Sequence, residues 1–176
     1  CQIDALRGVI EQVMDEHTKN VLLTVLMSVM SATASTTTHF AQFLKVKSKS
    51  TCNNLLTKRK INIIEECKAL MKEYRKSGLC SQKECKTFDC YNLDFSECLD
   101  SIVLNKSTDP PYFKEHYSRY YHVLNTLCLY DYPAMAINPQ THELSIGRYR
   151  EDRRVSDFGK KAKALGAFET LITKCA

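Results

Sequence analysis

Residues 53–76, NNLLTKRKINIIEECKALMKEYRK, decide how the rest of the chain is interpreted. Apolar side chains recur there at intervals of three and four residues, and charged side chains occupy most positions between them. This period predicts an amphipathic helix with one buried face. Asn53 or Asn54 can cap its start, and Ser77-Gly78 is typical of a helix end because glycine accepts the left-handed conformation. We therefore predict one helix of about 24 residues, roughly 36 Å long.

Two stretches further along the chain keep the same period. Residues 112–128 follow Pro110-Pro111, and proline is tolerated in the first turn of a helix. Residues 155–176 place apolar side chains on one face, with Ser156 and Asp157 as candidate caps. Both stretches are therefore predicted to be helical.

The helical period is broken between these two stretches. Pro133 and Pro139 interrupt it, and residues 134–137 and 143–146 flank a turn-like segment. This arrangement favours a short β-hairpin over a helix.

Composition supports a mainly helical globular chain with one core. The 176 residues are 44% hydrophobic and 26% charged, and they include only five glycines and four prolines. Such a chain is long enough to bury a core and too short for two comfortable domains. Repeats and low-complexity tracts are absent.

A strongly apolar run at residues 21–30 is followed by Ala-Thr-Ala at residues 32–34. The run has the length of the apolar region of a secretory signal peptide, and the tripeptide has the pattern of a cleavage site. The run is too short to span a bilayer, which needs about twenty apolar residues. The alternative is a buried amphipathic helix. The predicted organisation is a leader over residues 1–34, a flexible mature N-terminus over residues 35–51 and a helical domain over residues 52–176.

Cysteine usage supports export. Nine cysteines are present, and removal of the leader with Cys1 leaves an even number, which in an oxidising compartment favours four disulfides of unknown pairing. Four of these residues fall in residues 79–109, which we interpret as a long crossover loop pinned by disulfides. Asn105-Lys106-Ser107 adds an N-glycosylation acceptor. The disulfide candidates are Cys52, Cys67, Cys80, Cys85, Cys90, Cys98, Cys128 and Cys175.

Signatures of catalysis and of metal or cofactor binding are missing from the sequence. Only His116 and His122 share a predicted helix, and six residues is not a helical ligand spacing. No nucleophile elbow, zinc-protease motif, phosphate loop or dinucleotide fingerprint occurs. We therefore expect no enzyme activity, no cofactor and no metal site.

Charge indicates an interaction surface. Residues 1–34 contain two bases and four acids, so residues 35–176 keep 23 bases and 16 acids, a formal charge of +7. A secreted basic face can bind a heparin-like glycosaminoglycan or an acidic receptor, although charge runs are usually solvated faces. We expect neither nucleic-acid binding nor membrane insertion once the leader is removed. The clusters are Lys45 to Lys49, Lys58 to Lys60, Arg148 to Arg154 and Lys160 to Lys163.

Several short motifs resemble those of a known family. They are Cys52-Asn-Asn-Leu-Leu, the cysteine-dense loop that begins at Cys80, Leu127-Cys128-Leu129, and Asp157-Phe158 followed by Leu165-Gly-Ala-Phe168. With these motifs the chain resembles the long-chain four-helix-bundle cytokines around interleukin-6, and among them the interleukin-12 alpha-chain family. Glu169 and Leu171 stand where that family has basic residues that meet its beta chain, and residues 129–154 lack a convincing third helix.

The resemblance implies an all-α, up-up-down-down bundle that binds class I cytokine receptors through its first and last helices. It also implies secretion together with a soluble receptor-like beta chain. The runner-up is a small secreted disulfide-rich helical enzyme or lipid-binding module with helices around a pocket. The receptor-contact candidates are Lys58, Arg59, Lys68, Lys72, Lys160, Lys163 and Glu169.

Overall fold

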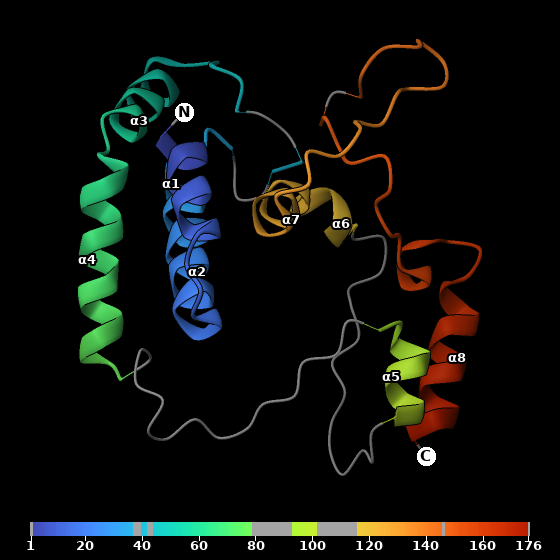
Figure 1. Ribbon diagram of the computed structural model, residues 1–176. Coiled ribbons are helices and arrows are strands. Elements are labelled where there is room, and N and C mark those ends of the chain that lie inside the picture. Colours follow the sequence, from blue (N-terminus) through green and yellow to red (C-terminus); the bar gives the residue numbers. More distant parts are fainter. Residues whose placement is uncertain are drawn as a thin grey trace. The chain divides into compact units, whose positions relative to one another are not determined.

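The computed structural model describes residues 2–36, 40–41, 44–78, 93–101, 116–145 and 147–175 (Figure 1). Within these ranges the regular structure is helical, which confirms the all-α prediction, whereas the up-up-down-down bundle stays a prediction. The elements are α1 (Gln2–Glu11), α2 (Glu16–Thr33), α3 (Lys49–Arg59), α4 (Ile63–Lys76), α5 (Phe95–Ser101), α6 (Tyr117–Tyr120), α7 (His122–Leu129), the 3-10 helix η2 (Asp157–Gly159) and α8 (Ala164–Cys175).

The chain divides into two compact units instead of the single core that we predicted. The first unit comprises Cys1–Cys85 and Arg119–Arg153, and the second comprises Lys86–Ser118 and Arg154–Ala176. Each unit has its own cluster of buried apolar side chains.

Helix α2 is the centre of the first unit and packs against α1, α3, α4 and α7 (Figure 1). Its start is fixed by Asp15, whose carboxylate accepts a hydrogen bond from the Thr18 backbone N–H, as expected of an N-cap. Leu23 and Leu26 form the core together with Ile10 of α1, and Leu26 is 1% exposed. Apolar burial of this kind is the main source of helix stability in a small unit.

The predicted apolar region of a signal peptide therefore lies in a helix with a buried face. In the structure, residues 21–30 match the alternative interpretation, a buried amphipathic helix. Cleavage after Ala34 stays a prediction. Among the described residues, no helix has the length and hydropathy needed to cross a membrane. The buried side chains of α2 are Leu23, Val25, Leu26, Val29 and Met30.

The single helix predicted over residues 53–76 is wrong, because the chain forms α3 and α4 with a break between them. The Asn62 side chain accepts hydrogen bonds from the backbone N–H groups of Ile64, at 3.1 Å, and Glu65, at 3.4 Å. Asparagine competes well for such groups, so it begins a new helix here instead of continuing the first. Helix α3 also begins at Lys49, inside the segment predicted to be flexible.

The stretch predicted as a helix over residues 112–128 is described from residue 116 onward, where it forms α6 and α7 with an interruption at Tyr121. The hairpin predicted between residues 134–137 and 143–146 is present only in part, because the described residues form no regular strand there and one of two bridges leads to Arg150, outside the predicted second arm. Isolated antiparallel bridges join Met135 to Arg150 and Ile137 to Leu144.

The second unit is built from α5, η2 and α8. Phe158 is 2% exposed, and its ring lies 4.7 Å from that of Phe95 and 4.9 Å from that of Phe168. Lys174 donates to the Asp100 carboxylate at 2.6 Å, so it joins α8 to α5. The helix predicted over residues 155–176 is shorter than expected. It begins at Ala164, and the 3-10 helix η2 lies before it.

Candidate functional site

Helix α4 carries two exposed flanks of opposite charge beside its buried face. At 100° per residue, Ile63 and Cys67 mark the face that packs on α2. Acidic Glu66 and Glu73 lie on one side of this face and basic residues lie on the other. We call the basic side the cationic flank. It consists of the exposed residues Ile64, Lys68, Lys72 and Arg75.

The cationic flank contains two of the predicted receptor-contact residues, Lys68 and Lys72. The Lys68 ammonium lies 3.0 Å from the Glu65 carboxylate, and both side chains are more than 60% exposed, so this pair contributes little to folding. Arg59 is exposed at the end of α3. Lys58 is different, because its ammonium donates to the Ala34 carbonyl at 3.0 Å and so ties α3 to the end of α2.

The other predicted contact residues belong to the second unit. Lys160 and Lys163 converge on Asp157, at 2.8 and 3.5 Å, and the hydrogen bond from Lys160 lowers the pKa of that carboxyl. Glu169 is exposed on α8. Exposed Leu165 and Ile172 lie on the same side of α8 as Glu169, which gives this helix a mixed apolar and acidic outer stripe.

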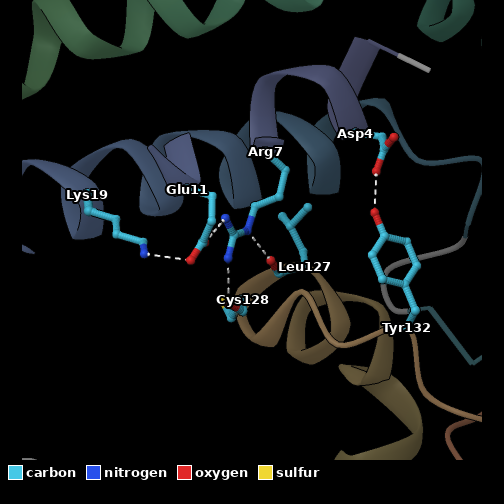
Figure 2. A network of polar contacts seen from close by, with 7 residues as sticks. All are labelled: Asp4, Arg7, Glu11, Lys19, Leu127, Cys128 and Tyr132. Carbon is cyan, nitrogen blue, oxygen red and sulfur yellow. Dashed lines mark hydrogen bonds and ion pairs between the residues drawn. The ribbon is translucent and has the colours of Figure 1, made fainter. Parts of the chain in front are cut away.

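A buried arginine joins α1 to α7 in the first unit (Figure 2). Arg7 is 2% exposed, and its guanidinium donates to the carbonyls of Leu127, at 2.6 Å, and Cys128, at 3.0 Å. These carbonyls belong to the last turn of α7, where helical partners run out. The Glu11 carboxylate balances the charge, and the hydrogen bond from Arg7, followed by that from Lys19, lowers the pKa of Glu11.

A second buried arginine changes the interpretation of the basic cluster at residues 148–154. Arg150 is 7% exposed and donates two hydrogen bonds to Asp131, at 2.7 and 2.8 Å. It also donates to the carboxylate of Asp152. These bonds lower the pKa of both carboxyls. Because Arg150 is paired within its own unit, it is not a free cation for glycosaminoglycan.

The five described cysteines form no disulfide with one another, and the predicted disulfides stay a prediction. Burial raises the pKa of both Cys67 and Cys128, which makes these two thiols less reactive than exposed ones. The predicted partners Cys80, Cys85 and Cys90, together with the glycosylation acceptor Asn105, lie outside the described residues. No cluster of metal-ligating side chains occurs in the described ranges. The free thiols are Cys52, Cys67, Cys98, Cys128 and Cys175.

Sequence reasoning missed the structural roles of Arg7 and Arg150. Arg7 and Glu11 have the i, i+4 spacing of a helical ion pair, so that part of the network was visible in the sequence. The bonds from Arg7 to α7 span 120 residues and more, and Asp131 lies 19 residues from Arg150. No local pattern marks contacts of that range.

Comparison with known proteins does not place the chain. No protein-family model, no curated protein and no solved structure matches it.

Proposed function

We propose that the protein is a secreted helical ligand that signals through class I cytokine receptors, as the alpha chain of a heterodimeric cytokine of the interleukin-12 type. The cationic flank of α4 carries this proposal, and the family resemblance of the sequence supports it. The flank combines an exposed apolar side chain, Ile64 at 43% exposure, with three cations on one helix, of which Lys68 is paired with Glu65. Such a surface suits an acidic protein partner, because complementary charge accelerates encounter and sets orientation.

The side chains of the cationic flank are not part of the buried core. The flank lies off the face that packs on α2, so its side chains are available to a partner without disturbing the core. Because α4 packs on α2, the flank is presented on a folded helix only where residues 1–34 are retained or another part of the chain covers the buried face of α4. The outer stripe of α8, Leu165, Glu169 and Ile172, supports a second contact surface on the last helix, where the resemblance implies one.

The direct test is binding to a panel of immobilised class I receptor ectodomains, with the protein purified from the medium of expressing cells. We expect the double variant Lys68→Glu/Lys72→Glu to lower the association rate for the cognate ectodomain about tenfold or more. We also expect the wild-type rate to fall with added salt. The matched control is Glu66→Gln/Glu73→Gln on the opposite flank of the same helix, which should change the rate less than about twofold. Absence of binding to every ectodomain, or equal effects of both double variants, contradicts the proposal.

Export has its own test. Cells that express the full chain should release it, and N-terminal sequencing of the released protein should begin at Ser35. Co-expression with a receptor-like beta chain should raise the released amount if the two assemble. Retention of the chain inside the cell contradicts the secreted part of the proposal and leaves the binding test to stand alone.

A further inference from the structure

The first unit contains a largely apolar pocket of about 470 Å³. Its walls come from α1, the end of α2, α7 and the segment after α7, all within one unit. We call residues 134–150, which contain the two antiparallel bridges, the paired segment. Pockets that bind small molecules have volumes of roughly 300–1,000 Å³ and are mostly apolar with a few polar groups. The pocket has both properties. Its apolar wall includes Ile3, Met30, Val123, Leu127 and Met135.

Two charged residues of this pocket already have partners. The Arg7 guanidinium is bonded to Glu11 and to two carbonyls of α7, and it lies 4.5 Å above the Tyr130 ring. Asp4 accepts a hydrogen bond from the Tyr132 hydroxyl at 3.1 Å (Figure 2). Arg7 thus makes three hydrogen bonds with partners of its own unit, and the Asp4 carboxylate accepts one.

Arg148 is the remaining charge at the pocket. It is exposed and makes no ion pair with any described residue. Its backbone has a φ of 48°, a left-handed conformation that costs energy for residues other than glycine, and its N–H donates to the Ser145 carbonyl at 2.8 Å. The preceding Gly147 is buried, and a Cβ there would lie 2.1 Å from the Tyr149 ring. The backbone around Arg148 is thus constrained, and Arg148 is among the residues that line the apolar pocket.

We propose that this pocket binds a single-chain aliphatic carboxylate, that is, a medium-chain or long-chain fatty acid. The chain lies along the apolar wall, where its burial supplies most of the affinity. The carboxylate accepts hydrogen bonds from the Arg148 guanidinium, which is suited to two-point recognition of that group. This activity belongs to the chain that keeps residues 1–34, because Ile3 and Met30 form part of the wall, and cleavage after Ala34 should abolish it.

A pair of probes that differ only in the head group tests the role of Arg148. Dodecanoate and 1-dodecanol are titrated into the full chain, with displacement of 1-anilinonaphthalene-8-sulfonate as the readout. The wild-type chain should bind dodecanoate about tenfold more tightly than the alcohol, which corresponds to about 1.4 kcal/mol. Arg148→Gln should abolish this preference and leave the affinity for the alcohol unchanged. The control Arg154→Gln removes an exposed cation of the second unit and should keep the preference. Equal affinity of the wild-type chain for both probes overturns the assignment of Arg148.

Methionine methyl resonances test the location without any substitution. In a chain labelled with 13C at the methionine methyl groups, dodecanoate should shift the signals of Met30 and Met135, which line the pocket. Met14, which is 96% exposed on another part of the unit, is an internal control and should not move. Shifts at Met14 alone, or no shifts at saturating dodecanoate, overturn the proposal.

Discussion

At the scale of single residues, the buried Arg7 shows how one side chain joins two distant segments. Its guanidinium satisfies two carbonyls at the end of α7 that the helix itself leaves without donors. A polar group that loses its partner on burial costs about 1–3 kcal/mol, more than the bond contributes when it is made. The stability of the first unit should therefore depend strongly on this residue.

The substitution Arg7→Met tests that dependence, because methionine keeps much of the volume and removes all donors. We expect the free energy of unfolding to fall by about 2–4 kcal/mol, the sum of the unpaired carbonyls and the lost packing. Urea denaturation followed by circular dichroism gives the value. Lys19→Met is the control, since Lys19 also binds Glu11 but makes only a partly exposed ion pair, worth less than about 1 kcal/mol. Similar losses for both variants contradict the role of Arg7.

His122 predicts a pH dependence. It is 5% exposed, its Nδ1 donates to the Arg119 carbonyl at 2.8 Å, and its ring packs edge-on against Tyr149. Burial lowers the pKa of His122 below its usual value of 6.5. The unfolded state therefore takes up a proton near pH 6.5 that the folded state resists. The contribution of His122 is complete above pH 6.5 and declines as the pH falls toward the lower pKa of the folded state.

Thermal unfolding at pH 7.5, 6.5 and 5.5 measures this effect. The wild-type midpoint should decrease as the pH falls through this range, and His122→Gln should flatten that decrease even if its midpoint is lower throughout. His142→Gln serves as the control because His142 is exposed on the paired segment, and it should keep the wild-type dependence. An unchanged slope in His122→Gln shows that another group titrates.

At the scale of elements, the break between α3 and α4 tests how a single cap divides a helical sequence. Asn62→Ala removes the acceptor for two backbone N–H groups at the start of α4. We expect a loss of about 0.5–2 kcal/mol in the free energy of unfolding. Asn54→Ala makes the same substitution inside α3, where alanine has the higher helix propensity, so it should be neutral or slightly stabilising. Hydrogen exchange at the Ile64 and Glu65 amides should accelerate only in the first variant.

The sequence predicted helices better than their ends. The period of apolar residues correctly marked the buried face of α4, because that period depends only on helix geometry. For α8 the predicted face was wrong: Leu165 and Ile172 are exposed, and the buried side chains are Ala164, Ala167 and Leu171. The period did not mark the cap at Asn62, since the run of helical spacing continues through that residue. The same holds for residues 155–163, where Asp157, a predicted cap, instead begins a 3-10 turn and binds Lys160.

The sequence predicted the role of a side chain where that role depends only on its position in its own helix. The exposure of Lys68, Lys72 and Glu169 follows from their positions on amphipathic helices, and the structure agrees. Lys58 and Arg150 carry the same charge in the sequence as any surface base, yet each is bonded within the first unit. Charge and spacing do not reveal such partners, because the partners come from other segments of the chain.

At the scale of the whole molecule, residues 1–34 have two roles to compare: the sequence predicts a leader there, and in the structure they supply the core of the first unit. The period of apolar residues predicts which side of a helix is buried, but it does not predict which other helix covers that side. The sequence therefore could not show that α4 packs on α2, or that α7 packs on α2 and bonds to α1. The division into two units could not be predicted either, because each unit is formed by segments that lie far apart in the sequence. A chain that starts at Ser35 distinguishes the two roles.

Without residues 1–34, the first unit loses Ile10, Leu23 and Leu26 from its core, and each fully buried side chain of this kind contributes about 1.5–3 kcal/mol. That loss is comparable with the whole stability of a small domain. We expect residues 63–76 to exchange their amide hydrogens rapidly in the shortened chain, measured by mass spectrometry. Residues 164–175 should keep their protection, because the Phe158 cluster contains no side chain from the deleted segment. Retained protection over residues 63–76 would instead favour a removable leader, with α4 packing on some other part of the chain.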